Sequence, residues 1–346
     1  MKKPLQEVKK ANNTGAPASG LSTPRFCGVF LLLTSLFWLQ PVFSTPLPPE
    51  IDESSGLARS LVAPERLWTH NDTHPIAGGD KQADAVLFAL DPSAKLIGRL
   101  RLTGVPQRDF ESIDNLIMAG RPTLVVADSG DNLLIWDDYR LWFIPEPSTE
   151  QLEKTTETRP IAVLRYQFDD GKSRDVEAIA AEYERDNIWL ITKRPLPAEV
   201  FRLNLSKATA IPEEGEISAH LDAAPIHHAE KIGKLGNLAP TSALRWLINP
   251  LVGEQVNRVT AMDQSPDGRL MAVLTYAGVY YFKREPEQSW GEVLQSPPEH
   301  SQPLPGIRQW EGLSFNQTGD AVWISREGHG KDGLISLPLP KPLSQE

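Results

Sequence analysis

The sequence predicts an all-β fold, because its apolar residues recur in short runs and not with the longer period of helices. After residue 44 these runs are rich in Val, Ile, Leu, Trp and Tyr, and clusters of Asp, Asn, Gly and Pro separate them. Turn residues between short apolar runs are typical of antiparallel strands. The clearest runs are 66–68, 85–90, 124–127, 141–144, 161–166, 188–191, 271–275, 279–282 and 321–325.

A repeated pattern makes the fold prediction more specific. Five segments carry an acidic or polar residue, then a small residue and an aliphatic one, and each is followed by a strand with polar residues at its end. One four-stranded sheet of this kind cannot bury both faces alone, so the repeats should stack around an axis as the blades of a β-propeller. We predict a single propeller of five or six four-stranded blades over residues 45–346. The repeats begin at Glu53, Glu111, Glu177, Thr260 and Glu311.

Two alternatives to this simple plan remain open. Residues 206–255 show little strand pattern, so they form either an insertion or a degenerate sixth blade. A pair of two-sheet sandwiches is the competing architecture. It does not predict the constant offset between each repeated acid and the later polar residues, which the propeller does.

The first 44 residues have the order of a secretory signal peptide. A basic lead precedes a 14-residue apolar run over 26–39, and Val42-Phe43-Ser44 precedes a Pro-rich stretch. This order predicts cleavage after Ser44 and a periplasmic or secreted protein. Because the apolar run is shorter than the roughly 20 residues that span a bilayer, an uncleaved N-terminal anchor is the alternative.

Composition restricts the chemistry and the partners. Cys27 is the only cysteine and lies in the predicted leader, so the mature chain has no disulfide, thiolate metal site or thiol nucleophile. The chain has a formal charge of −10, and the leader carries +4, which leaves −14 after cleavage. Such a surface repels polyanions. We expect a monomer that binds a small molecule or a protein, and neither nucleic acid nor, once cleaved, a membrane.

The repeated acids are the candidate metal ligands. Inner strands of a propeller begin at one mouth of its central channel, so Glu53, Glu111, Glu177 and Glu311 should converge there, with Thr260 in the fifth place. Like charges in a partly dehydrated channel repel one another unless something neutralises them. Calcium or another divalent cation suits an all-oxygen site, although Thr260 makes the ring of acids asymmetric.

A salt-bridge network is the internal alternative to a bound cation, because basic residues flank the same repeat positions. Of these we assign Lys193 and Arg326 to ligand contact, together with Asn71 and Asp72 after the second predicted strand. The flanking basic residues are Arg108, Arg174, Lys193, Arg194, Arg258 and Arg326.

His70 and Asp128 are the candidate general bases. His70 has the side chain that titrates nearest neutrality, and Asp128 opens an oxygen-rich segment that lacks the spacing of an EF-hand and also fits an ordinary Asp/Gly turn. The sequence contains no serine-hydrolase elbow, zinc-protease motif, phosphate loop or dinucleotide fingerprint. Serine-hydrolase, zinc-protease and nucleotide-dependent functions therefore lose support.

The order of the polar motifs carries a resemblance over about residues 53–339. The motifs are Glu53-Ser-Ser-Gly-Leu57, Trp68-Thr-His-Asn-Asp72, Asp128-Ser-Gly-Asp-Asn132, Asp175-Val-Glu-Ala178, Ser265-Pro-Asp-Gly268 and Trp310-Glu-Gly-Leu313. They resemble those of bacterial secreted β-propellers of largely unassigned function, which are distantly similar to phytase-like esterase and gluconolactonase-type propellers. The resemblance implies the fold and export. It does not select an activity, because such frameworks host hydrolases, lectins and scaffolds.

Two functions follow from these observations, and the sequence does not decide whether the chain is an enzyme. The first is an exported binding propeller whose acidic mouth accepts a cation, a small molecule or a protein partner. The second is a metal-dependent hydrolase of an ester, lactone or phosphoester, in which a cation held by the four glutamates polarises the substrate and activates water.

Overall fold

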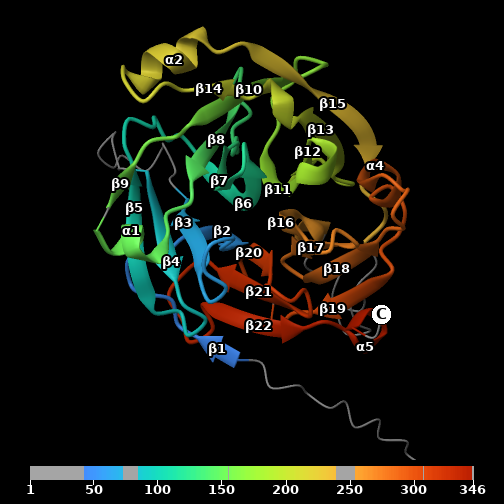
Figure 1. The fold of residues 1–346 in the computed structure, drawn as a ribbon. Helices are drawn as coiled ribbons and strands as arrows, with labels where there is room; N and C mark the ends of the chain where they lie inside the picture. Colours follow the sequence, from blue (N-terminus) through green and yellow to red (C-terminus); the bar gives the residue numbers. More distant parts are fainter. Residues whose placement is uncertain (1–42, 73–84, 155, 239–253, 307, 345–346) are drawn as a thin grey trace, which may run out of the picture. The chain divides into compact units, whose positions relative to one another are not determined.

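The described part of the chain forms five blades within four hydrogen-bonded sheets, and the prediction of an all-β propeller is confirmed (Figure 1). The computed structural model describes residues 43–72, 85–154, 156–238, 254–306 and 308–344. We number the blades 1 to 5 in the order of their inner strands along the chain. Within each blade the four principal strands are antiparallel, apart from contacts that β15 (Ile226–Lys234) makes across two blades.

The blades share one plan, in which the strands follow one another in chain order from the inner to the outer edge, except at the outer edge of blade 5. Blade 1 contains β2 (Ser54–Arg59), β3 (Leu67–Asn71), β4 (Val86–Leu90) and β5 (Leu96–Leu102). Blade 2 contains β6 (Phe110–Met118), β7 (Arg121–Asp128), β8 (Tyr139–Pro145) and β10 (Ala162–Phe168). Blade 3 contains β11 (Val176–Glu182), β12 (Asn187–Thr192), β13 (Glu199–Asn204) and β15. Blades 4 and 5 contain β16 (Val259–Gln264), β17 (Leu270–Thr275), β18 (Gly278–Lys283) and β19 (His300–Pro303), and β20 (Trp310–Phe315), β21 (Ala321–Arg326), β22 (Leu334–Pro338) and β1 (Phe43–Thr45).

Short elements join or extend the blades. Strand β9 pairs parallel to β5, and strand β14 pairs with β10. The short strands and helices are β9 (Glu157–Thr158), β14 (Thr209–Ala210), α1 (Thr149–Lys154), α2 (Ile217–Ala223), α4 (Trp290–Val293), α5 (Lys341–Ser344) and the 3-10 turns η1 (Tyr183–Arg185), η2 (Leu205–Lys207) and η3 (Glu254–Asn257). No helix among the described residues is both long and apolar enough to cross a membrane.

The five inner strands close into a ring. Strand β2 contacts both β6 and β20, and β11 and β16 complete the circle between them. Because five blades already close the ring, the weakly patterned stretch supplies no sixth blade within its described part, 206–238 and 254–255. It supplies β14, α2 and β15 instead.

The hydrophobic core lies between neighbouring blades. The cluster between blades 1 and 2, for example, joins Trp68, Phe110 and Trp142, none of which is exposed. A fully buried large apolar side chain contributes about 1.5–3 kcal/mol to stability. Buried indoles also need an acceptor for the ring N–H, and Trp68 Nε1 donates to Glu146 Oε1 at 2.9 Å. Stacking of blades therefore supplies the apolar burial that a single blade lacks.

Strand β1 completes blade 5. It pairs antiparallel with β22, with Ser44 opposite Ile335, and the Ser44 hydroxyl donates to the carbonyl of Lys331 at 3.0 Å. Strands from the two ends of the described chain thus share one sheet. A cut after Ser44 would leave only Thr45 of this strand, and export and cleavage remain predictions from the sequence.

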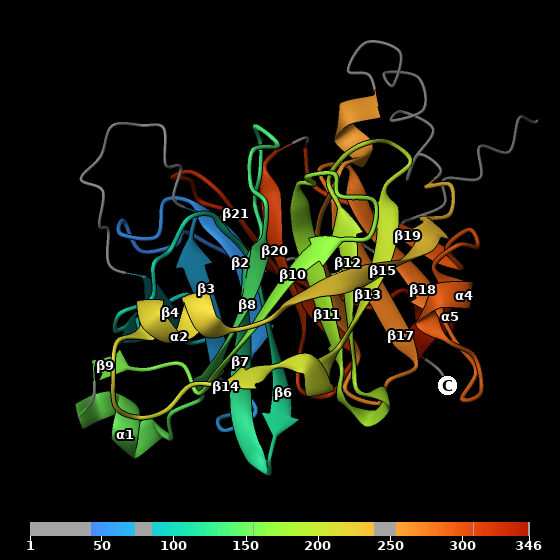
Figure 2. The same ribbon diagram turned by 90° about the horizontal axis from the view of Figure 1, so that it is seen from above.

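Strand β15 joins blades 2 and 3 into one nine-stranded sheet. Its first residues pair parallel to β10, and its last residues pair antiparallel to β13. Figures 1 and 2 show this long strand running alongside both partners. Two neighbouring blades are therefore connected by backbone hydrogen bonds as well as by side-chain packing.

Candidate functional site

Every inner strand has a register shift close to its first residues. The pairing of β6 with β7 skips Glu111, and the pairing of β11 with β12 skips Glu177. Thr260 and Glu311 are skipped in the same way in blades 4 and 5. An extra residue of this kind is a β-bulge, which redirects a side chain and is frequent beside active sites. The acid that repeats in the sequence is therefore the bulge residue of its inner strand.

Blade 1 corrects the register inferred from the sequence. Its shift lies between Ser54 and Leu57, so Ser55, and not Glu53, occupies the position of the repeated acid. The Ser55 hydroxyl donates to Glu111 Oε2 at 2.9 Å. Glu53 is exposed, and its backbone forms an isolated bridge with Glu327. The sequence-based alignment of the first repeat is thus wrong by two residues, and Glu53 does not join the other three glutamates.

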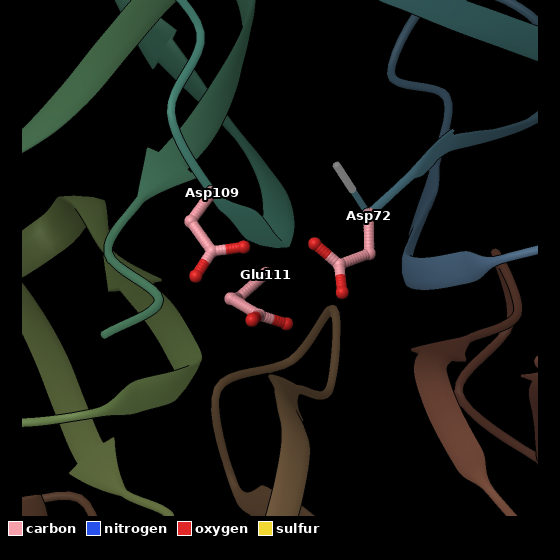
Figure 3. Close-up of side chains that lie close together, drawn as sticks. All are labelled: Asp72, Asp109 and Glu111. Carbon is pink, nitrogen blue, oxygen red and sulfur yellow. The ribbon is translucent and has the colours of Figure 1, made fainter. Parts of the chain in front are cut away.

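The other three glutamates do converge, and they do so beside two aspartates. Oxygen atoms of Glu111, Glu177 and Glu311 lie within 4.8 Å of one another, and we call these residues the second triad. Oxygen atoms of Asp72, Asp109 and Glu111 also lie within 4.8 Å of one another, and we call these the first triad. Figure 3 shows the three carboxylates of the first triad facing a common point. Glu111 belongs to both triads, so the acids form one continuous cluster.

The elements that carry the first triad explain its geometry. Asp109 and Glu111 flank Phe110, the first residue of β6, and Asp72 directly follows β3 of the neighbouring blade. Asp109 is 4% exposed, Glu111 2% and Asp72 5%. The backbone of Gly130 covers one side, since a Cβ there would come within 2.5 Å of Asp109 Oδ2 and Glu111 Oε1. Only glycine leaves these two carboxylates in place.

The second triad has a counter-ion of its own. Lys193 Nζ lies 2.5 Å from Glu177 Oε1 and 3.9 Å from Glu311 Oε1. The Tyr276 hydroxyl donates to Glu311 Oε1 at 2.8 Å. Of the six basic residues considered for a salt-bridge network, only Lys193 pairs with these glutamates among the described residues. A salt-bridge contact therefore exists at the second triad, through Lys193.

Two acids of the first triad, Asp109 and Glu111, lack a direct counter-ion of this kind within the described residues. Asp109 and Glu111 form no ion pair with any lysine or arginine in the described part of the chain. Two buried oxygen atoms in the cluster, Asp109 Oδ1 and Glu177 Oε2, also have no hydrogen-bond partner there. A buried carboxylate oxygen without a donor is costly. These two oxygen atoms could therefore accept a ligand.

Burial and mutual repulsion raise the proton affinity of the cluster. Burial, followed by a hydrogen bond and charge repulsion from Asp72, raises the pKa of Asp109 to about 10. Burial and the charge of Glu177 raise the pKa of Glu111 well above its usual value. Burial and contact with Glu311 raise the pKa of Glu327 to about 10. Near neutral pH and without a cation, protons therefore hold these carboxyl groups together.

His70 has a structural environment. It is fully buried in β3, its ring stacks edge-on against Phe110 with centroids 5.8 Å apart, and a Cβ on Gly56 would come within 2.8 Å of its Nε2. Burial lowers the pKa of His70 to about 4, so the ring is neutral near pH 7. This arrangement explains the Gly56 of the first motif, whose φ is +136°, and it gives the predicted catalytic role no support.

Asp128, the second candidate base, likewise has a structural role, because it accepts hydrogen bonds from backbone amides. Its Oδ1 accepts the amides of Arg108 and Asp109 at 3.0 and 2.8 Å, which fixes the segment leading into β6. Its Oδ2 lies 3.5 Å from Arg108 Nε and 3.6 Å from a terminal nitrogen of Arg140. Asp128 thus positions Asp109 and does not belong to either triad.

The predicted ligand contacts divide between the cluster and its surroundings. Asp72 and Lys193 belong to the cluster. The Asn71 side chain bonds the backbone of Glu53 and donates to the carbonyl of Glu50 at 2.9 Å. Arg326 pairs with Asp332 at 2.9 Å. Asn71 and Arg326 are therefore occupied by neighbouring loops.

Sequence reasoning missed Asp109, Ser55 and Tyr276. A usable signal existed for Asp109, because Asp109-Phe-Glu111 and Asp175-Val-Glu177 share an Asp-x-Glu pattern at the same place in two repeats. Asp175 does not join a triad, since its Oδ2 pairs with Arg194 at 2.8 Å. Ser55 and Tyr276 had no signal of this kind, because their roles follow from contacts between blades.

The cluster fits a hard cation. Its donors are all carboxylate oxygens, with no histidine or cysteine in either triad. Calcium and magnesium prefer oxygen ligands, whereas structural zinc sites use sulfur and imidazole nitrogen. The oxygen of Asp109 that has no donor, and the lack of a direct counter-ion for Asp109 and Glu111 among the described residues, both favour such an ion at the first triad.

Known proteins resemble this chain only distantly. No protein-family model and no curated protein sequence matches the chain. Among solved structures, it resembles the WD40 repeats of RRP9 (14% identity, TM-score 0.38, 83% of this chain and 67% of that one). It also resembles a candidate 6-phosphogluconolactonase from Bacteroides uniformis (11% identity, TM-score 0.38, 87% and 70%) and U3-55K (15% identity, TM-score 0.37, 83% and 68%). Similarity at this level carries no information on function.

Proposed function

We propose that this propeller binds a hard divalent cation, with calcium as the first candidate, through Asp72, Asp109 and Glu111. The cation in turn would hold an anionic or carbonyl-bearing small ligand. One observation carries the proposal. Three buried carboxylates converge while Asp109 and Glu111 pair with no described basic residue, although the adjoining triad has Lys193. A cation would replace the protons that otherwise keep these groups neutral.

The test is calcium binding by metal-stripped protein, measured by calorimetry and by the shift in melting temperature. Saturating calcium should stabilise the protein by mass action, by about 2.7 kcal/mol at a hundredfold excess over the dissociation constant. Asp109→Asn, which keeps the shape and removes the charge, should weaken binding at least a hundredfold, since a buried charged ligand contributes several kcal/mol.

Asp137→Asn is the matched control. Asp137 is an exposed residue of the loop between β7 and β8, so the same chemical change there should leave calcium binding unaltered. Equal calcium affinity in the Asp109→Asn variant and the wild type would refute the proposed site. Binding of magnesium or manganese in preference to calcium would keep the site and change its ion.

A second function, metal-dependent hydrolysis, is favoured by the groups on the other side of Glu111. Burial raises the pKa of the Tyr276 phenol, and Glu177 and Glu311 keep the Lys193 ammonium charged. Both groups therefore keep their protons near pH 7 and can donate hydrogen bonds to an oxygen that gains negative charge during reaction. A bound cation would polarise a substrate carbonyl or phosphoryl group. The general base would then be a carboxylate such as Glu177, and not His70 or Asp128.

Assays with a panel of substrates distinguish the hydrolase function from the binding function. Esters, lactones and phosphoesters should be turned over by calcium-loaded protein, and Tyr276→Phe should reduce kcat without abolishing calcium binding. If calcium binds with wild-type affinity and none of the three classes is hydrolysed, the chain is a binding protein.

A further inference from the structure

A polar cavity lies on blade 3, at the end opposite the carboxylate cluster. Strand β11 begins with the cluster residue Glu177 and runs to the far end, where β12 begins. A cavity of about 400 Å³ opens there, along the outer three strands of the blade. Its charged and titratable lining residues are Arg185, Arg202, Lys207, His227, His228 and Glu230.

The cavity is basic, although the chain is acidic. Three permanently charged cations line it and only one carboxylate does, in a protein with a formal charge of −10. Arg185 is partly engaged, because it donates to the carbonyls of Gln288 and Pro286 and lies 3.6 Å from Glu182. The charge of the cavity is thus opposite to that of the carboxylate cluster.

Several donors in this cavity remain available. The Lys207 ammonium forms no ion pair with a described carboxylate. Arg202 directs Nε and one terminal nitrogen to a single oxygen, Glu230 Oε2, and its other terminal nitrogen bonds no described residue. His227 Nε2 is buried and has no hydrogen-bond partner within the described residues. The cavity therefore combines net positive charge with hydrogen-bonding groups that protein acceptors do not satisfy.

We propose that this cavity binds a small molecule through a phosphate or sulfate group. A tetrahedral oxyanion offers several acceptor oxygens, which suits an ammonium, a guanidinium and an imidazole that approach from different elements, η2, β13 and β15. The volume lies within the range of small-ligand sites, about 300–1,000 Å³. The proposal does not depend on the cation at the first triad.

The probe is inorganic phosphate, with sulfate and acetate for comparison, titrated into the full chain in metal-free buffer. Without a cation, the carboxylate cluster cannot hold the oxyanion. Binding is followed by calorimetry and by the histidine ring signals in proton NMR spectra. Phosphate and sulfate should bind saturably, and acetate at least about tenfold more weakly, because it offers fewer oxygens to the three donors.

Two variants and a control locate the binding. Lys207→Met and Arg202→Gln should each weaken phosphate binding about tenfold, the effect of losing one charge-assisted hydrogen bond. Lys234→Met, an exposed position on the same strand as His227 but outside the cavity lining, should leave it unchanged. The far-ultraviolet circular dichroism of all three should match the wild type.

The pH dependence of binding distinguishes a site that includes His227 from general charge attraction. Burial, Lys207 and the neighbouring His228 lower the pKa of His227, and His228 Nδ1 lies 3.3 Å from Asp169 Oδ1. A bound oxyanion should raise that pKa, so sulfate, whose own charge does not change in this range, should bind more tightly as the pH falls toward 6, and the titrating NMR signal should disappear in a His227→Gln variant. Absence of saturable phosphate binding, or equal weakening by Lys207→Met and Lys234→Met, would overturn the proposal.

Discussion

Two groups of buried acids line the same inner strands and differ in what surrounds them. Deeper along these strands, Asp114 of β6 and Asp263 of β16 are 4% and 3% exposed, much like the cluster residues at the strand starts. Asp114 Oδ2 accepts the amide of Ala181 at 2.6 Å, and Asp263 Oδ2 accepts the amide of Phe315 at 2.7 Å. Each of these bonds joins one blade to the next.

The deeper acids also have a basic partner. Arg59 of β2 pairs with Asp263 at 2.9 Å, across the ring from blade 1 to blade 4. Burial, followed by the charge of Asp263, raises the pKa of Asp114 to about 8, and backbone amides and Arg59 limit the rise. At the strand starts, the pKa of Asp109 rises to about 10, because repulsion from Asp72 adds to burial.

The difference shows how to distinguish a structural acid from a binding one in this fold. The deeper acids and the cluster acids are similarly buried, and both sets are carboxylates. The deeper acids accept hydrogen bonds that fasten neighbouring blades, whereas the cluster acids face one another and leave oxygens without donors. Burial alone therefore does not mark a site; the supply of donors does.

The largest effect should come from removing a deeper acid. Asp263→Ala leaves Arg59 buried without its partner and the Phe315 amide without an acceptor, so it should reduce the free energy of unfolding by about 3–5 kcal/mol. Urea denaturation of the metal-free protein measures it. Asp263→Asn keeps an acceptor oxygen and should cost less. A loss below about 1 kcal/mol for Asp263→Ala would contradict the structural role.

Calcium affinity should rise with pH. The metal-free carboxyl of Asp109 has its pKa near 10, so calcium must displace a proton at pH 7, and affinity should rise by up to about tenfold per pH unit below pH 10. Calorimetry in buffers of different ionisation enthalpy should detect the released proton. Affinity that is constant between pH 6 and 9 would show that the first triad is already ionised.

Metal-free protein should lose stability as the pH rises. Asp109 and Glu327 have folded pKa values raised to about 10, so their protonated forms favour the fold fully below the unfolded carboxyl pKa of about 4. That contribution declines as the pH rises from about 4 toward 10. Melting temperatures in chelator should fall across this window, and calcium should reduce the fall. An increase with pH would contradict it.

A smaller effect is expected at Ser55. Ser55→Ala removes the hydroxyl that orients Glu111, so it should weaken calcium binding a few-fold, equivalent to about 0.5–1.5 kcal/mol. Ser54→Ala, one residue earlier on the same strand, serves as the comparison, because the Ser54 hydroxyl bonds Thr69 and Ser325 at 2.8 Å and not the cluster. Equal effects on calcium affinity would argue against orientation of Glu111.

The smallest effect should be that of Asp109→Asn on stability. Near pH 7 the metal-free Asp109 carboxyl holds a proton, and an asparagine amide can take over its hydrogen bond to Asp72. The free energy of unfolding without calcium should therefore change by less than about 0.5 kcal/mol. A loss as large as that of Asp263→Ala would remove the distinction between the two groups of acids.

The fold was predictable from the sequence because its signal is repeated. Turn residues mark each strand, and the motif around Glu111 recurs once per blade, so five weak patterns support one conclusion. The exchange of β15 between blades was not predictable, since it depends on pairing of Arg165 with Ile226, which no local pattern encodes. From the sequence, residues 206–255 therefore fitted either an insertion or a degenerate sixth blade.

The candidate site was only partly predictable. Glu111, Glu177 and Glu311 follow from the repeat, because each is the bulge residue of its strand. Blade 1 has a longer shift, which includes Gly56, and counting from the acid therefore selected Glu53 in place of Ser55. His70 was interpreted as a catalytic base because its side chain titrates near neutral pH. In the structure, it packs against Phe110, and burial keeps its ring neutral.

The shared strand β15 has a mechanical consequence. Backbone pairing from β10 through β15 to β13 splices blades 2 and 3 together, whereas the β9 segment of blade 2 pairs with β5 of blade 1 over only two residue pairs. Both halves of the Asp-x-Glu pattern, Asp109 with Glu111 and Asp175 with Glu177, belong to this spliced pair. If neighbouring blades separate transiently, we expect the separation at a junction other than that between blades 2 and 3. Most cluster ligands would then move together as a rigid unit, while Asp72 and Glu311 would move relative to them.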